Sequence, residues 1–206
     1  YVQKKSIQSG ESVGEILNTN NISFSQIDIV AKKARKLFDL RDVKAGGDYI
    51  LMFKDSTLSK LNYFIYEINK VDFLVANLLD TTDVYLDEKE LIVKEKTGSG
   101  IIKSSLWFAM EESNLSAKLV NILADEIYPW TIDFFRLNTG DKFKIIYDAK
   151  YVEGEFIGVG KVHAALFQTN NMDYYAINFN ELGKFEEYFD EKGNNLRKFF
   201  LKAPVS

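Results

Sequence analysis

Two short turn sequences inside the stretch from Trp130 to Phe167 constrain the fold of this chain more than any other feature. Thr139-Gly140-Asp141 and Glu153-Gly154 divide the stretch into three segments in which apolar and aromatic residues recur. Glycine beside an acidic residue suits a tight reversal of the chain, and the middle segment alternates between apolar and polar residues as a strand does. The stretch therefore predicts three consecutive antiparallel strands at the centre of an α+β fold.

Residues 1–57 carry the signals of a small β-α-α-β module. Its strands are expected at Tyr1–Ile7 and Asp48–Phe53, and Ser12 has the capping-box spacing to Glu15 at the start of a helix over Val13–Leu17. A longer second helix begins at Ser23 or Ser25. Its apolar stripe is predicted at spacings of three and four residues, at Phe24, Ile27, Ala31, Ala34 and Phe38.

Residues 58–206 are predicted to form a β-rich domain in which two helices cover the main antiparallel sheet. The first helix is expected after Ser104 or Ser105, and the second runs from Ser116 to Pro129. Residues 61–68 and 71–79 have the pattern of two strands that could pack with either part of the chain. We place the domain boundary after residue 57.

Composition and charge exclude several classes of function. The net charge of -4 and the pI of about 5.2 argue against general nucleic-acid binding, which requires a basic surface. There is no cysteine, which excludes disulfides and thiolate metal sites. No run of about 18 apolar residues is present, so no membrane span is expected. The first residue is Tyr1 rather than Met, which favours removal of an upstream segment such as a signal peptide.

The N-terminal module resembles the LysM and OapA-like modules in two segments. These are QSGESVGEILNTNNIS, from residue 8, and DVKAGGDYILMF, from residue 42. The resemblance implies recognition of N-acetylglucosamine-containing glycans through the two loops beside the sheet. The glycan-binding residues implied in this way are Ser9, Gly10, Glu11, Ser12, Lys44, Gly46 and Gly47.

The second half resembles the non-catalytic region that precedes the catalytic domain in Gram-negative lysostaphin/LytM-type zinc metallopeptidases. The resemblance spans residues 97–206, in the blocks GSGIIKSSLWFAM, LADEIYPWTIDFFRLNTGDKFKIIY, GEFIGVGKVHAALF and YFDEKGNNLRKFFLKAPVS. It implies an exported protein of the periplasm or cell envelope. It also implies two partners, which are peptidoglycan or its glycan strands and the protein's own catalytic domain in cis.

The zinc site of such peptidases is missing from this sequence. The resemblance implies two His and one Asp from H-x-x-x-D and H-x-H segments, and three protein ligands are usual for catalytic zinc. This chain has one histidine, His163, which Ala164, Ala165, Leu166 and Phe167 follow. We therefore predict no catalytic, cofactor-binding or metal-binding residues here and expect zinc in the missing catalytic domain. His163 is predicted to be a packed, hydrogen-bonded residue of a strand.

These observations favour a non-catalytic region of a peptidoglycan metalloendopeptidase that binds the cell wall and regulates, or autoinhibits, the catalytic domain. The alternative is a stand-alone carbohydrate-binding or envelope scaffold protein without peptidase activity. In that alternative Trp107, Trp130 or surface tyrosines would stack on sugars, whereas most aromatic side chains of a globular domain fill its core.

Overall fold

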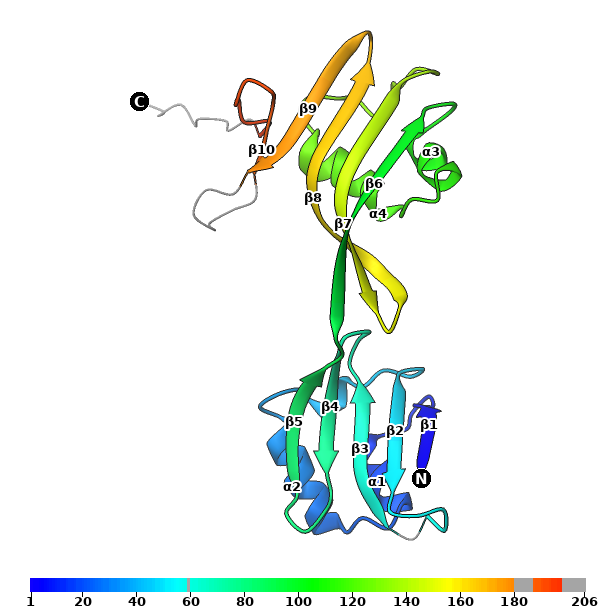
Figure 1. Ribbon diagram of the computed structural model, residues 1–206. Helices are drawn as coiled ribbons and strands as arrows, with labels where there is room; N and C mark the ends of the chain where they lie inside the picture. The colour runs from blue at the N-terminus through cyan, green and yellow to red at the C-terminus, as the bar shows by residue number, and fades with distance from the viewer. Residues whose placement is uncertain (59, 180–186, 198–206) are drawn as a thin grey trace, which may run out of the picture. The chain divides into compact units, whose positions relative to one another are not determined.

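The structure, a computed structural model, describes residues 1–58, 60–179 and 187–197. The chain divides into two compact units, Tyr1–Leu91 and Ile92–Ser206, and each is described below by itself (Figure 1). Each unit combines helices with an antiparallel sheet, so the predicted α+β class is confirmed. Residues 198–206, which end the last block of the resemblance, lie outside the described residues.

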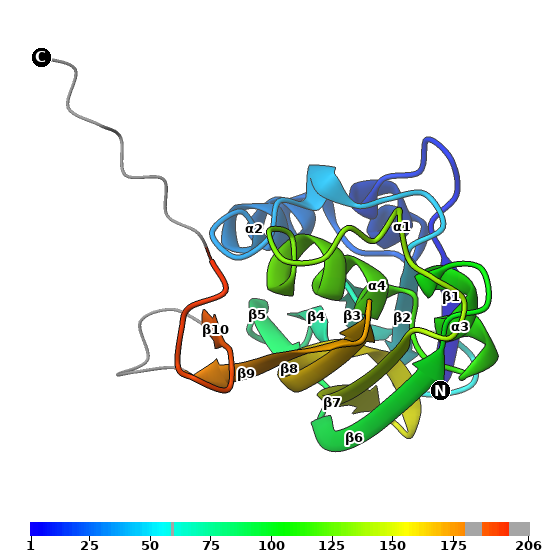
Figure 2. The same ribbon diagram turned by 90° about the horizontal axis from the view of Figure 1, so that it is seen from above.

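The described part of the first unit forms a five-stranded sheet in the order β1-β2-β3-β4-β5, with every neighbouring pair antiparallel. The helices α1 (Val13–Thr19) and α2 (Phe24–Ala34) lie on one face of this sheet (Figure 2). A short 3-10 helix, η1 (Leu40–Asp42), leads back to the sheet. The strands are β1 (Val2–Ser6), β2 (Asp48–Phe53), β3 (Leu61–Glu67), β4 (Asp72–Asn77) and β5 (Asp83–Glu88).

The compact units divide after Leu91, whereas the sequence analysis placed the domain boundary after residue 57. The reason is the pairing of β2 with β3, in which Tyr49 lies opposite Tyr66 and Phe53 opposite Leu61. Strands β4 and β5 continue the same sheet, and their inward side chains share one apolar core with α1 and α2. A cut after residue 57 would separate hydrogen-bonded strands.

The capping box predicted for α1 is present. The Ser12 hydroxyl accepts a hydrogen bond from the Glu15 N–H at 3.2 Å, and the Glu15 carboxylate accepts one from the Ser12 N–H at 2.8 Å. Both bonds occupy N–H groups that have no partner within the helix. The hydrogen bonds to Ser12 also hold the pKa of Glu15 below its ordinary value. Both contacts join residues three apart in the chain, so the local sequence determines where α1 begins.

The apolar stripe of α2 differs from the predicted one. Val30 and Ala34 are buried and Ile27 packs beside them, whereas Phe24 is 77% exposed and Ala31 is exposed. The spacings of three and four residues are those expected, but the face turned toward the sheet includes Val30. Phe24 is the first residue of the helix.

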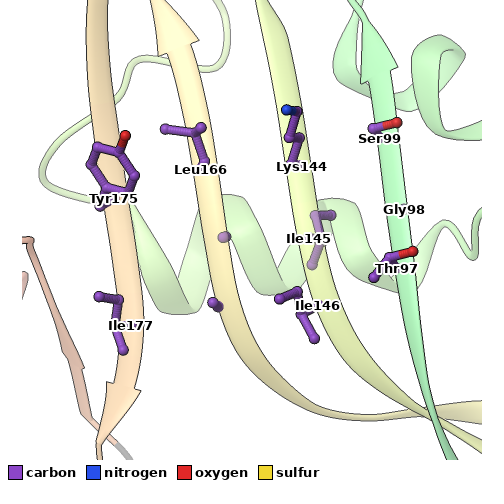
Figure 3. Close-up of a pocket in the computed structure, with 11 residues that line it drawn as sticks. Thr97, Gly98, Ser99, Lys144, Ile145, Ile146, Leu166, Tyr175 and Ile177 are labelled. Carbon is purple, nitrogen blue, oxygen red and sulfur yellow. The ribbon is translucent and has the colours of Figure 1, made fainter.

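The described part of the second unit also contains a five-stranded sheet, in the order β10-β9-β8-β7-β6. Helices α3 (Leu106–Glu112) and α4 (Lys118–Asn121) precede its central hairpin, and the π-helix η2 (Ile122–Ile127) continues α4. Figure 3 shows a helix behind the strands of this sheet. The strands are β6 (Leu91–Ile101), β7 (Lys142–Val152), β8 (Glu155–Thr169), β9 (Met172–Phe179) and β10 (Glu187–Phe189).

The segment 130–137 is not a strand, contrary to the prediction. It forms turns, and β6 occupies the edge beside β7 that the segment would have needed. The other edge of β7 is paired with β8 along the whole hairpin. Since both edges of β7 are taken, residues 130–137 lie outside the sheet. The two predicted turns at Gly140 and Gly154 are present, and both glycines have positive φ.

Tyr128 connects the helical layer of the second unit to its sheet. Its ring is fully buried, and its hydroxyl lies 3.1 Å from the carbonyl oxygen of Ala165 on β8 and 2.8 Å from that of Tyr174 on β9. Burial raises the pKa of this hydroxyl well above its ordinary value, so it stays a donor. The ring of Phe167 meets that of Tyr128 edge-on at 6.5 Å. Tyr128 therefore fixes the end of η2 over the centre of the sheet.

Replacing Tyr128 by Phe should destabilise the second unit. The substitution keeps the ring but leaves buried carbonyl oxygens without their donor, which costs about 1–3 kcal/mol. Urea unfolding followed by circular dichroism measures this loss. Tyr175→Phe, which removes a partly exposed hydroxyl in the same sheet, is the matched control and should change stability by less than about 0.5 kcal/mol. Equal effects of the two substitutions would contradict the role of Tyr128.

Candidate functional site and family

The two loops predicted to bind glycans are neighbours in the first unit. Strand β1 ends with Ser6 opposite Asp48 of β2, and the ladder continues one step further through Ile7. The Gly46 N–H donates to the Ile7 carbonyl at 2.8 Å, and the Ile7 N–H donates to the Gly47 carbonyl at 2.9 Å. Residues 8–12 (the first loop) and residues 43–47 (the second loop) therefore leave the same end of one strand pair.

The first loop is held by its own hydrogen bonds and exposes most of its residues. The Gln8 N–H donates to the Glu11 carboxylate at 2.9 Å, and the Glu11 N–H donates to the Gln8 carbonyl at 3.1 Å. Gly10 has a φ of 82°, a conformation that disfavours other residues. Ser9, Gly10 and Ser12 are exposed, and Ser12 also caps α1. The loop thus presents hydroxyl, carboxylate and backbone groups to solvent.

The second loop is held by β3. The Tyr66 hydroxyl accepts a hydrogen bond from the Lys44 N–H at 3.2 Å, and the Gly47 N–H donates to the Lys44 carbonyl at 2.9 Å. A Cβ atom on Gly47 would lie 2.8 Å from the Tyr66 hydroxyl oxygen and 2.9 Å from the Lys44 carbonyl oxygen. Only glycine fits at this position. Lys44 and Gly46 are exposed, so the loop presents an amine beside open backbone.

Charges of both signs lie around the loops. The Ser6 hydroxyl donates to the Asp48 carboxylate at 2.8 Å and holds its pKa below the ordinary value, and the nearby Lys4 ammonium acts in the same direction. Glu11 and Lys44 add one charge of each sign. An arrangement of hydroxyls, exposed backbone and charges of both signs suits a polar ligand. The structure brings the seven predicted residues together, and their glycan binding stays a prediction.

His163 contacts Asp148 across the β7–β8 hairpin. Its Nε2 atom lies 2.8 Å from the Asp148 carboxylate, and its side chain is 36% exposed. The predicted hydrogen bond is therefore present, although the imidazole is half-buried rather than buried. Among the residues that the structure describes, no group of three or more His, Cys, Asp or Glu side chains could hold a metal ion. His163 and Asp148 alone do not match the three-ligand requirement of catalytic zinc.

The second unit has an apolar recess on the open face of its sheet, which the sequence analysis missed. The recess holds about 500 Å³ and is lined by β6 to β9. Figure 3 shows Lys144, Leu166, Tyr175 and Ile177 on this face. Lys144 lies opposite Leu166, which lies opposite Tyr175, so these side chains form one row across the strands. The sequence signal that could have revealed this recess was Ile146, an apolar residue on the face of β7 that is otherwise expected to be polar.

The sequence of the second unit places the chain in a family. Residues 92–206 match the family model described as the Csd3 second domain, and the match begins where the second unit begins. The chain belongs to this family. Helicobacter pylori Csd3, in its hexagonal crystal form, has the same fold with a TM-score of 0.62 and 20% identity. That comparison covers 99% of this chain and 54% of the Csd3 chain.

Curated relatives extend the match into the first unit. The peptidoglycan DD-endopeptidase ShyC of Vibrio cholerae is 34% identical over 173 residues, which are 82% of this chain and 37% of ShyC. An uncharacterized metalloprotease of Haemophilus influenzae is 25% identical over 169 residues, which are 81% of this chain and 34% of that protein. This chain thus spans about a third of the length of these relatives.

A solved structure confirms the fold of both parts of the chain. A zinc containing peptidase from Vibrio cholerae matches with a TM-score of 0.66 and 20% identity, over 99% of this chain and 61% of that one. At this identity the likeness concerns the fold. In the described part of the chain, no helix is long and apolar enough to cross a membrane.

Replacing Gly47 by Ala should destabilise the first unit and displace the second loop. The added methyl group would overlap with Tyr66 and with the Lys44 backbone, and such overpacking costs about 1–3 kcal/mol. Gly14→Ala is the matched control, because a Cβ there makes ordinary contacts of 3.8 Å with Ile27 and 3.9 Å with Ser12. Alanine inside α1 should stabilise that variant by up to about 1 kcal/mol. Thermal unfolding measures both, and a neutral Gly47→Ala would contradict the close approach.

Proposed function

We propose that this chain is the non-catalytic, cell-wall-binding and regulatory region of an exported peptidoglycan metalloendopeptidase. One observation carries the proposal: the 34% identity with ShyC extends over 82% of this chain but over only 37% of ShyC. This chain matches only part of an endopeptidase, and it contains one histidine. Both facts suit an accessory role. Zinc then belongs to a catalytic domain elsewhere in the full-length protein. The periplasm or cell envelope, where peptidoglycan lies, is the proposed location.

The first and second loops of the N-terminal unit are the proposed contact with peptidoglycan glycan strands. Their exposed hydroxyl, amine and backbone groups can exchange hydrogen bonds with the hydroxyl and acetamido groups of amino sugars. The loops are held by Ile7 and Tyr66, so little conformational entropy is lost when a ligand binds. The LysM-like sequence of this region supports the same ligand.

Loop variants should reduce binding to insoluble peptidoglycan. Ser9 and Lys44 are exposed, one in each loop, and the double variant Ser9→Ala/Lys44→Ala should lower the affinity about tenfold through lost polar contacts. The matched control is Ser25→Ala/Lys36→Ala, which removes the same groups from exposed positions outside both loops. Co-sedimentation with purified sacculi, quantified over a range of protein concentrations, measures both affinities. Equal binding of the two double variants would exclude the loops as the contact.

The proposed regulatory role concerns the catalytic domain in cis. If the accessory region covers the catalytic groove, removal of residues 1–206 from the full-length protein should raise the rate of peptidoglycan hydrolysis. Release of soluble fragments from labelled sacculi measures this rate. The control is the 206-residue chain alone, which should release none. A truncated protein that is no faster than the full-length protein would contradict a covering role, and hydrolysis by the chain alone would contradict the non-catalytic assignment.

A further inference from the structure

A second recess of the C-terminal unit lies on the helical side, away from the open sheet face. It holds about 790 Å³, and α4, η2 and the turn segment 129–135 line it. Two aromatic side chains in its lining are exposed: Trp130 by 51% of its surface and Phe135 fully. Large exposed aromatic side chains that gather at one concave surface indicate a contact site, because burial would otherwise be favoured.

The turn segment anchors Phe135 through its neighbours in the chain. Ile132 is buried and Phe134 packs against the core, where its ring meets that of Phe167 edge-on at 5.2 Å. The Asp133 carboxylate accepts a hydrogen bond from the Phe135 N–H at 3.0 Å, and the Asp133 carbonyl accepts one from the Arg136 N–H at 3.0 Å. Anchors on both sides of Phe135 therefore keep its ring in solvent.

The polar groups of the recess restrict the kind of ligand. Asn121 and the carboxylates of Asp125 and Asp133 line it beside the rings. Arg136 lies outside the lining, 3.5 Å from the Asp133 carboxylate. The acidic lining repels anionic ligands such as nucleic acids or acidic peptides. It also supplies hydrogen-bond acceptors that a purely apolar ligand would leave without donors.

A neutral sugar ring can contact both the aromatic rings and the polar side chains of this lining. The C–H groups of a pyranose form apolar faces that stack on aromatic rings, and its hydroxyls donate to carboxylate and amide oxygens at the rim. We propose that the recess formed by Asn121, Asp125, Trp130, Asp133 and Phe135 binds saccharide units of the N-acetylglucosamine type. The choice of an amino sugar rests on the proposed peptidoglycan function. The site itself is independent of the two loops of the first unit.

Tryptophan fluorescence can observe this site directly, because the chain contains two tryptophans. In the variant Trp107→Phe, Trp130 is the remaining indole. Titration of this variant with chitotetraose, the β-1,4-linked tetramer of N-acetylglucosamine, should give a saturable change in emission. The reciprocal variant, Trp130→Phe, reports from Trp107 and should show no saturable change. A missing response in the first variant, or an equal response in the second, would overturn the proposal.

Phe135→Ala provides the test of affinity in the Trp107→Phe background. Its ring is fully exposed, so the substitution should leave the fold intact, and the dissociation constant should rise about tenfold on loss of an aromatic anchor. Phe24→Ala, at an exposed position of the first unit, is the matched control and should leave the dissociation constant unchanged. Equal dissociation constants for the two variants would overturn the site.

The loop variant Ser9→Ala/Lys44→Ala separates this inference from the proposed function. In the same background it should keep the full Trp130 response, since the response arises in the second unit. If that variant binds sacculi normally while Phe135→Ala loses the Trp130 response, glycan binding by the loops is excluded and saccharide binding by the recess is supported. If the loop variant loses sacculus binding while Phe135→Ala keeps the full Trp130 response, saccharide binding by the recess is excluded and glycan binding by the loops is supported.

Discussion

Burial of one face of an antiparallel sheet under helices is the constraint on which both units depend. In the first unit, Leu51, Phe64 and Leu74 supply fully buried side chains from three neighbouring strands, and Leu17 of α1 meets them. In the second unit, Tyr128 joins the helical layer to β8 and β9 through its buried hydroxyl. Since each sheet buries one face in this way, binding functions are left to loops, to open faces and to the outer side of the helices.

In the first unit, the sheet holds two loops next to each other. Ile7 extends the β1–β2 ladder beyond its last strand residue, and Tyr66 reaches from β3 to the Lys44 backbone. The chain has no cysteine, so neither loop is held by a disulfide. The loops are therefore properties of the sheet, which is why their positions follow from strand register and from the glycines at 10, 46 and 47.

The second unit carries the family match, and its two recesses differ in chemistry. The recess on the open sheet face is apolar, with Lys144 at its border, whereas the recess beside Trp130 combines aromatic rings with carboxylates. Their difference follows from their origin. The open sheet face presents a row of one residue from each strand, Lys144, Leu166 and Tyr175, whereas the segment 129–135 lines its recess with consecutive residues of one turn.

Local features were determined by the sequence alone. The capping box at Ser12 and the turns at Gly140 and Gly154 follow from residues close together in the chain, and the α+β class and the relation to peptidoglycan metallopeptidases follow from the order of such local patterns along it. The tertiary structure decided the domain boundary, the absence of a strand at 130–137, the buried face of α2 and both recesses. These depend on partners distant in sequence: β3 completes the sheet of β2, β6 takes the edge of β7, and Ile27, Val30 and Ala34 are selected by the sheet they meet. A local pattern specifies the period of an element, and only packing specifies which neighbour that element contacts.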